Sequence, residues 1–187
     1  MQLYVDGKLE AREMQNIIYD LVGSNGSRFF SPYCWRSRMA LAHKEVEHKS
    51  RPTRLCEIPF VTAGGYRTVP TLRINGTEVN DSWNIASYLE DKFSNRNSLF
   101  GGDSGRALSR FIDSWIVSIV QPALFPMIAA DTCGCLDDES KPYFRESREK
   151  RLGCSLDEAQ ARREDDIYSF RRLLHPLRMT IRSQPFL

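Results

Sequence analysis

Ser31-Pro32-Tyr33-Cys34-Trp35-Arg36 is the stretch that decides the fold of this chain. Pro32 suits the first turn of a helix, so the stretch predicts a helix that begins just after Ser31. Four apolar residues at three- to four-residue spacing predict one buried stripe on that helix: Trp35, Met39, Ala42 and Val46. The start of such a helix leaves backbone N–H groups unpaired near Ser31, and their positive potential favours a bound anion.

The residues before and after this helix predict a small mixed sheet. Asn16 to Leu21 is rich in β-branched and aromatic residues, which predicts a strand that ends at the Gly- and Ser-rich residues 23–27. Asn75-Gly76 predicts a tight hairpin turn between two antiparallel strands. Asn80, Asp81 and Ser82 are capping residues, and a helical stripe follows them at Ile85, Leu89 and Phe93. Residues 48–66, with two prolines and a Gly pair, predict no more than a weak strand and a short helix.

The second half of the chain reads as helical throughout. A first apolar helix face is predicted by six residues: Leu108, Phe111, Ile112, Trp115, Ile119 and Val120. Ser155 to Glu158 is a capping box, and Pro176 is expected to kink or break the last helix. The polar, Gly-rich residues 95–105 predict a linker. We therefore expect an α+β domain over residues 16–94, followed by an all-α domain over residues 104–187.

Composition excludes several classes of protein. The 187 residues carry a net charge of +2, which is too balanced to indicate binding to nucleic acid or to a membrane surface. The chain contains no run of eighteen apolar residues, so the sequence predicts no transmembrane helix. The charges within residues 1–15 argue against a signal peptide. Five cysteines, an odd number without framework spacing, favour the reducing cytoplasm. Cys133-Gly134-Cys135 lacks both zinc spacing and a nearby histidine, so we expect no metal site.

Three motifs taken together resemble the glutathione S-transferase family. They are residues 31–44, Val69-Pro70-Thr71-Leu72, and residues 81–89, and a helical segment at residues 143–150 adds to them. The first motif is also similar to a thioredoxin-type Cys-Pro-Tyr-Cys site whose leading cysteine has become Ser31. Within the family, the chain is most similar to the serine-type branch that includes bacterial β-aryl-etherases and related fungal transferases. The resemblance, which runs from about Ile17 to the end, implies a thioredoxin-like domain followed by an all-helical domain.

The resemblance also implies a function and a set of site residues. Glutathione would be the co-substrate, and its thiolate would attack a hydrophobic electrophile by conjugation or by β-ether cleavage. Ser31 would stabilise the thiolate, with Tyr33 as the rival donor. Val69, before a family cis-proline at Pro70, would present its backbone to the extended tripeptide. Asp81 would receive the ammonium group of glutathione, and Ser82 at the helix start would hold the γ-glutamyl carboxylate.

Plainer interpretations of the same residues stay open. Ser31 and the pair Asp81-Ser82 also suit simple helix caps, and Pro70 suits the start of an edge strand. A second hypothesis is a thiol–disulfide or deglutathionylating enzyme that uses Cys34, which would then need a reactive thiol of low pKa. A third is a non-catalytic module that keeps the transferase fold for binding.

The resemblance further implies a cytoplasmic homodimer and an electrophile pocket between the domains. Trp115, Ile119 and Phe125 are candidates to line that pocket, but the sequence assigns none of them and does not name the electrophile. The chain departs from the family pattern in two ways. Residues 1–15 precede the expected first strand and are either a further strand or an extension. The chain also stops where the family continues into further core helices, which we interpret as a C-terminally truncated member.

Overall fold

The computed structural model describes residues 16–185, which divide into two compact units after Gly101. The interpretation of residues 1–15 falls outside the described residues. In the first unit the elements are β1 (Ile17–Leu21), α2 (Pro32–His43), β2 (Lys49–Thr53), the 3-10 turn η1 (Leu55–Glu57), α3 (Ile58–Val61), β3 (Thr71–Ile74), β4 (Thr77–Asn80) and α4 (Ser82–Lys92). This order of strands and helices confirms the thioredoxin-like fold expected for the first half.

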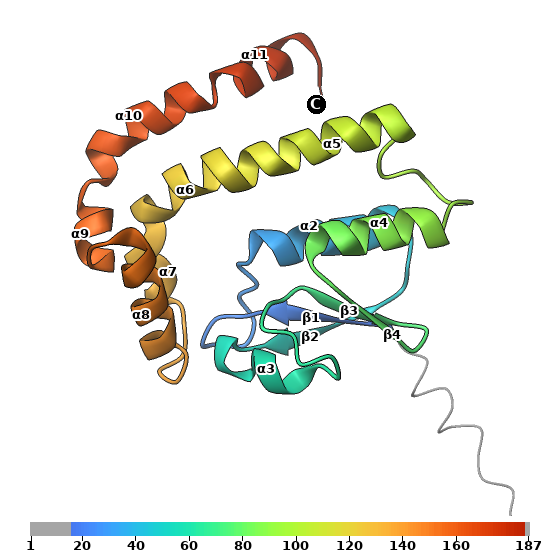
Figure 1. Cartoon of the computed structure of the whole chain (residues 1–187), viewed down its shortest axis with the longest axis horizontal. Coiled ribbons are helices and arrows are strands. Elements are labelled where there is room, and N and C mark those ends of the chain that lie inside the picture. Colours follow the sequence, from blue (N-terminus) through green and yellow to red (C-terminus); the bar gives the residue numbers. More distant parts are fainter. Residues whose placement is uncertain (1–15, 186–187) are drawn as a thin grey trace, which may run out of the picture. The chain divides into compact units, whose positions relative to one another are not determined.

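The first unit is built on a four-stranded sheet in the order β2-β1-β3-β4. Strands β1 and β2 are parallel, whereas β1 with β3 and β3 with β4 are antiparallel. Helices α2 and α4 cover one face of the sheet and α3 lies on the other (Figure 1). The predicted hairpin is confirmed: Asn75 and Gly76 have φ angles of 49° and 75°, the left-handed values that a two-residue turn of this kind requires.

The core of this unit lies between the sheet and its two long helices. It consists of Ile18, Leu72 and Ile74 from the strands, with Ala40, Leu41, Val46, Ile85 and Leu89 from α2, α4 and the turn after α2. The stripe predicted on α4 is confirmed, since Ile85 and Leu89 are fully buried and Phe93 packs against the core.

The stripe predicted on α2 is wrong except for Val46, which lies after the helix and is buried in the core. Trp35 and Met39 are 45% and 68% exposed, whereas Cys34, Ser37, Ala40 and Leu41 form the buried face. Small side chains at 34, 37 and 40 let the helix lie close to the sheet, so the bulkier side chains turn outward. On this outer face the Trp35 ring makes polar contacts. Its Nε1 donates to the Phe29 carbonyl at 3.0 Å, and the Arg38 guanidinium lies 4.4 Å from the ring centroid.

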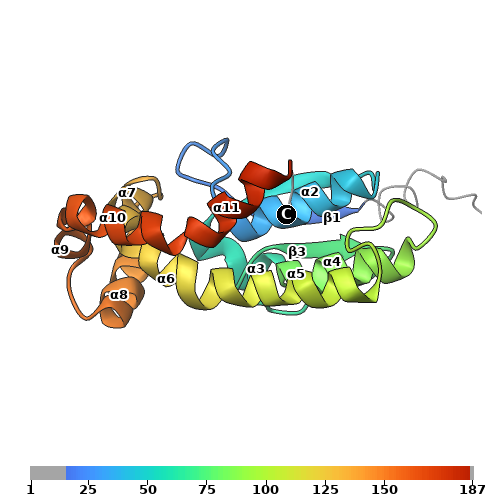
Figure 2. The ribbon, with the colours of Figure 1, turned by 90° about the horizontal axis from the view of Figure 1, so that it is seen from above.

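The second unit is helical throughout its described residues (Figure 2). Its elements are α5 (Asp103–Trp115), the π-helical turn η2 (Ile116–Val120), α6 (Gln121–Leu124), the 3-10 turn η3 (Phe125–Ile128), α7 (Ala129–Gly134), α8 (Lys141–Leu152), α9 (Leu156–Ala161), α10 (Arg163–Leu173) and α11 (His175–Ser183). The capping box at α9 is confirmed, with the Ser155 hydroxyl accepting from the Glu158 N–H at 3.1 Å. The predicted break at Pro176 is also confirmed, because α10 ends before it and α11 begins beside it.

The apolar face predicted at the start of this unit is present, but it is not core within the chain. Leu108 and Phe111 on α5 are 59% and 66% exposed, and Ile119 is 45% exposed. Among the described residues, the helical stretch Asp103–Gly134 is long and apolar enough to cross a membrane, by length and composition alone. The core helix of a soluble protein passes the same test.

Candidate functional site

Ser31 lies at the start of α2, as the sequence predicted. It is the N-cap of the helix, is only 6% exposed, and its Oγ accepts a hydrogen bond from the Cys34 N–H at 3.3 Å. A hydroxyl that accepts one bond in this way still has its own proton to donate. Tyr33, the rival donor, is the second residue of α2 and is half-buried, and the Arg36 guanidinium lies 5.3 Å from its ring centroid.

Cys34 is unsuited to thiolate chemistry. Its side chain is fully buried, and that burial raises the pKa of the Cys34 thiol to about 12, although interactions with Ser31 and the Leu21 backbone act in the opposite direction. A thiol of this kind carries almost no thiolate at neutral pH. Burial and the raised pKa therefore disfavour the reactive, low-pKa cysteine that the thiol–disulfide hypothesis needs.

Below Cys34 lies a buried carboxyl group that sequence analysis did not single out. Asp20, in β1, is fully buried, and the Arg38 Nη1 atom lies 3.5 Å from its Oδ2. Burial raises the pKa of Asp20, while Cys34, Arg38 and His48 act to lower it. Asp20 is the charged residue of the otherwise apolar and aromatic strand Ile17–Leu21. Its position there was the signal in the sequence for a role other than packing.

Val69 and Pro70 lie directly before β3, and the peptide bond between them is cis, as the resemblance implied. The segment is joined to the start of α4 by a backbone hydrogen bond, because the Asp81 N–H donates to the Pro70 carbonyl at 3.2 Å. The structure therefore brings together the second and third of the three sequence motifs.

Asp81 is the N-cap of α4, and its Oδ1 accepts from the Trp83 and Asn84 N–H groups at 2.9 and 3.1 Å. Its φ of 78° is unusual for a residue other than glycine, a conformation that costs about 1–3 kcal/mol and tends to occur at functional sites. Ser82 is the first residue of α4 and is 5% exposed. Capping uses one carboxylate oxygen of Asp81, and a carboxylate has lone pairs for further donors.

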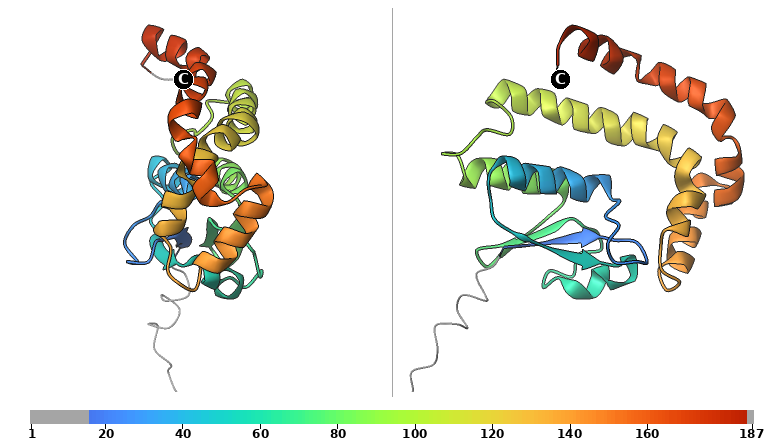
Figure 3. Two further views of the ribbon diagram at one scale, coloured as in Figure 1. Left: turned by 90° about the vertical axis from the view of Figure 1, so that its left-hand side faces the viewer. Right: turned by 180° about the vertical axis from the view of Figure 1, so that it is seen from behind.

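The two capped helix ends lie at the same end of the first unit. Helices α2 and α4 pack against each other and run in the same direction, so the ends that carry Ser31 and Asp81 point the same way (Figures 1 and 3). Each end carries the positive end of a helix dipole. The arrangement suits a ligand that is extended and anionic.

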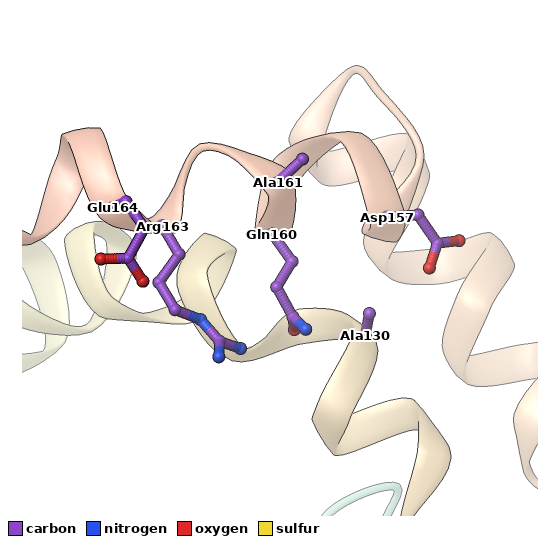
Figure 4. Close-up of a pocket in the computed structure, with 6 residues that line it drawn as sticks. All are labelled: Ala130, Asp157, Gln160, Ala161, Arg163 and Glu164. Atoms are coloured by element: carbon purple, nitrogen blue, oxygen red, sulfur yellow. The ribbon is translucent and has the colours of Figure 1, made fainter.

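The second unit has an open depression of its own, formed by Ala130, Asp157, Gln160, Ala161, Arg163 and Glu164 (Figure 4). None of the predicted site residues lines it. Its polar groups bind neighbouring protein atoms: Gln160 Nε2 donates to Asp131 Oδ1 at 2.9 Å, and Arg163 Nε donates to the Met127 carbonyl at 2.7 Å. These bonds hold α9 to α7 and α10 to η3, so we assign the depression a structural role.

Comparison with known families matches both halves of the chain. Residues 30–92 match the family described as "Glutathione S-transferase, N-terminal domain", and residues 107–187 match "Glutathione S-transferase, C-terminal domain". Maleylacetoacetate isomerase of Rattus norvegicus is 32% identical over 103 residues, which cover 51% of this chain and 48% of that protein. The chain thus spans about half the length of the curated relatives it matches.

Solved structures show the same fold at low identity. A glutathione transferase of Phanerochaete chrysosporium has a TM-score of 0.76 at 24% identity, covering 90% of this chain and 73% of its own. A glutathione S-transferase of Ceriporiopsis subvermispora, solved in complex with glutathione, has a TM-score of 0.76 at 21% identity, covering 91% and 74%. Glutaredoxin 2 of Salmonella typhimurium, also solved with glutathione, has a TM-score of 0.61 at 18% identity, covering 87% and 71%.

Proposed function

Since this chain belongs to the glutathione S-transferase family, we propose that it binds glutathione and activates the thiol for attack on a hydrophobic electrophile. One observation carries the proposal. The N-cap serine of α2 and the N-cap aspartate of α4 lie at one end of the same unit, with the Val69-Pro70 segment bonded to the second of them. Solved fungal relatives of the same fold include glutathione complexes.

The proposed roles follow from the chemistry of each group. The Val69 backbone pairs with the extended cysteinyl unit of glutathione, as in strand addition. Asp81 receives the ammonium group, and the Ser82 hydroxyl with the start of α4 holds the γ-glutamyl carboxylate. The Ser31 hydroxyl donates a hydrogen bond to the thiolate, and the positive end of α2 adds to this stabilisation. Tyr33 is the alternative donor.

The proposed reaction is a nucleophilic substitution or addition at carbon. The thiolate forms a C–S bond with the electrophile, and in the etherase version the C–O bond breaks and a phenolate leaves. We propose a cytoplasmic homodimer and an electrophile pocket to which Trp115, Ile119 and Phe125 are candidate contributors. A role for Cys34 as a redox nucleophile is disfavoured, because its thiol is buried and its pKa is raised to about 12.

The test is a titration of the full chain with glutathione, followed by the ultraviolet absorbance of the thiolate. Wild type is compared with Ser31→Ala and Ser155→Ala. Both substitutions remove an N-cap serine and are each expected to cost about 1 kcal/mol of stability, but only Ser31 belongs to the proposed site. The proposal expects a thiolate signal in wild type and in Ser155→Ala that is absent in Ser31→Ala.

Each other outcome has a defined meaning. A signal that survives in Ser31→Ala and disappears in Tyr33→Phe would transfer the role to Tyr33. Glutathione binding with no thiolate and no turnover of any electrophile would favour the non-catalytic module. Absence of glutathione binding in a folded chain would refute the proposed function.

A further inference from the structure

The side chain of Asn80, the last residue of β4, is bonded to the segment that leads into β3. Its Nδ2 lies 2.8 Å from the Thr68 carbonyl, 3.2 Å from the Pro70 carbonyl and 2.8 Å from Thr71 Oγ1. Its Oδ1 accepts from the Thr68 hydroxyl at 3.3 Å. The Asn80 carboxamide thus makes hydrogen bonds on both sides of the Val69-Pro70 peptide bond, to Thr68 before it and to Pro70 and Thr71 after it.

The chemistry of these neighbours requires a hydrogen-bond donor at position 80, which the Asn80 amide supplies. Two of the three groups near Nδ2 are backbone carbonyls, which only accept hydrogen bonds, so the nitrogen and not the oxygen must face them. An aspartate in the same place would direct a carboxylate oxygen at two carbonyl oxygens. An alanine would leave both carbonyls without this donor.

Asn80 also connects this segment to the start of α4. It immediately precedes Asp81, whose N–H donates to the same Pro70 carbonyl. Its own carbonyl accepts from Asn84 Nδ2 in the first turn of α4 at 3.2 Å. One residue therefore joins the segment before β3, the end of β4 and the first turn of α4.

We propose that Asn80 is a positioning residue that fixes the spacing between the Val69 backbone and the Asp81–Ser82 end of α4. This inference rests on the proposed function, in which these two places hold the cysteinyl and γ-glutamyl parts of glutathione. A fixed spacing selects for the length of the γ-glutamyl linkage. The isomer α-glutamyl-cysteinyl-glycine has the same atoms and charges but separates its ammonium and carboxylate groups differently, so it is expected to bind less well.

The experiment measures dissociation constants of the full chain for glutathione and for the α-linked isomer, in wild type, Asn80→Ala and Asn75→Asp. The last variant is the control, since Asn75 is an asparagine of the same β-hairpin at its opposite end and its left-handed φ is tolerated by aspartate. Asn80→Ala is expected to weaken glutathione binding about tenfold, the scale of one lost set of hydrogen bonds, and to reduce the preference for glutathione over the isomer. Asn75→Asp is expected to keep both wild-type values.

A second variant keeps the inference open to refutation if Asn80→Ala does not fold. In Asn80→Asp the carboxyl group can donate to a carbonyl only when it is protonated. Its glutathione affinity, expressed as a ratio to wild type at the same pH, is therefore expected to recover as the pH falls from 7 to 4, toward the ordinary aspartyl pKa of about 3.9. A purely structural defect in a variant that stays folded would not produce that recovery.

The outcomes distinguish a failure of the proposed function from a failure of the positioning role of Asn80. Wild type that does not bind glutathione refutes the proposed function, and the role of Asn80 falls with it. Wild type that binds, with an Asn80→Ala variant of equal affinity and equal preference between the isomers, refutes the positioning role alone. An Asn80→Asp ratio that does not change with pH refutes it as well.

Discussion

The Lys44 ammonium nitrogen lies 2.6 Å from Oε2 of Glu90, although the Lys44 side chain is only 1% exposed. The same nitrogen donates to the Phe93 carbonyl at 3.2 Å, and Glu90 accepts from the Leu99 N–H at 2.9 Å and from the Ser98 hydroxyl. Lys44 caps the C-terminus of α2, and Glu90 lies in the last turn of α4. This pair therefore joins the far ends of the two helices whose opposite ends form the candidate site.

Replacing Lys44 with methionine is expected to destabilise the first unit by about 3 kcal/mol, because it leaves the largely buried Glu90 carboxylate without its counter-charge. The double variant Lys44→Met with Glu90→Gln is expected to recover part of that loss. Denaturant unfolding of the two variants measures both effects. Lys141→Ala, which breaks an exposed pair with Asp138, is the control and should cost less than about 1 kcal/mol. An equal loss in the single and double Lys44 variants would show that the pair itself does not matter.

Glu90 makes stability depend on pH in the acid range. Burial opposes its ionisation, but bonds from the Leu99 N–H, Lys44 and Ser98 outweigh burial and hold the pKa of Glu90 at about 2, below its ordinary value of 4.5. The folded state thus binds fewer protons than the unfolded state between these values, and stability rises with pH there. The advantage of wild type over Glu90→Gln should be full above pH 4.5 and decline as the pH falls toward 2. Unfolding free energies across this range measure it, and a constant difference would contradict the assignment.

Asp20 is expected to make the stability depend on pH in the opposite sense to Glu90. Its pKa is raised by burial above the ordinary value of 3.8, so the folded state binds more protons than the unfolded state just above that pH. The contribution of Asp20 to stability is therefore present below pH 3.8 and is lost as the pH rises through its folded pKa. Asp20→Asn removes this dependence and should gain stability relative to wild type between pH 4 and pH 7. The gain is read from unfolding free energies at both values, and a relative loss that grows with pH would refute the account.

Cys34 should resist alkylation in the folded chain. Its burial and its pKa of about 12 predict almost no reaction with iodoacetamide at pH 7.5, whereas the partly exposed Cys56, Cys135 and Cys154 should react. Mass spectrometry of the labelled, digested protein identifies the modified residues, and labelling in denaturant provides the control for complete reaction. Rapid labelling of Cys34 in the folded chain would restore the thiol–disulfide hypothesis.

The features that sequence predicted well are those encoded by neighbouring residues. The Asn75-Gly76 turn, the Ser155 cap and the break at Pro176 each depend on local backbone geometry, and the structure contains all three. The buried face of α2 was predicted wrongly, because it depends on how closely the helix approaches the sheet. Hydrophobicity favoured Trp35 and Met39, while contact with the sheet selected the smaller Cys34 and Ser37.

The role of Asn80 was missed for a related reason. Its partners Thr68 and Pro70 lie 12 and 10 positions away, and only the pairing of β3 with β4 brings them together. In the sequence, Asn80 was interpreted as one of three capping residues, whereas the structure assigns the N-cap of α4 to Asp81. The positions of Ser31 and Asp81 at helix starts were predictable because capping is local.

The parallel packing of α2 and α4 has a thermodynamic consequence. Two helices that lie side by side and point the same way place two partial positive charges near each other, and these repel. An anionic ligand that binds only the folded unit offsets that repulsion and shifts the unfolding equilibrium, by about 2.7 kcal/mol when its concentration is 100 times its dissociation constant. For such a ligand, its supply in the cell would set how much of the chain stays folded as well as how much is occupied.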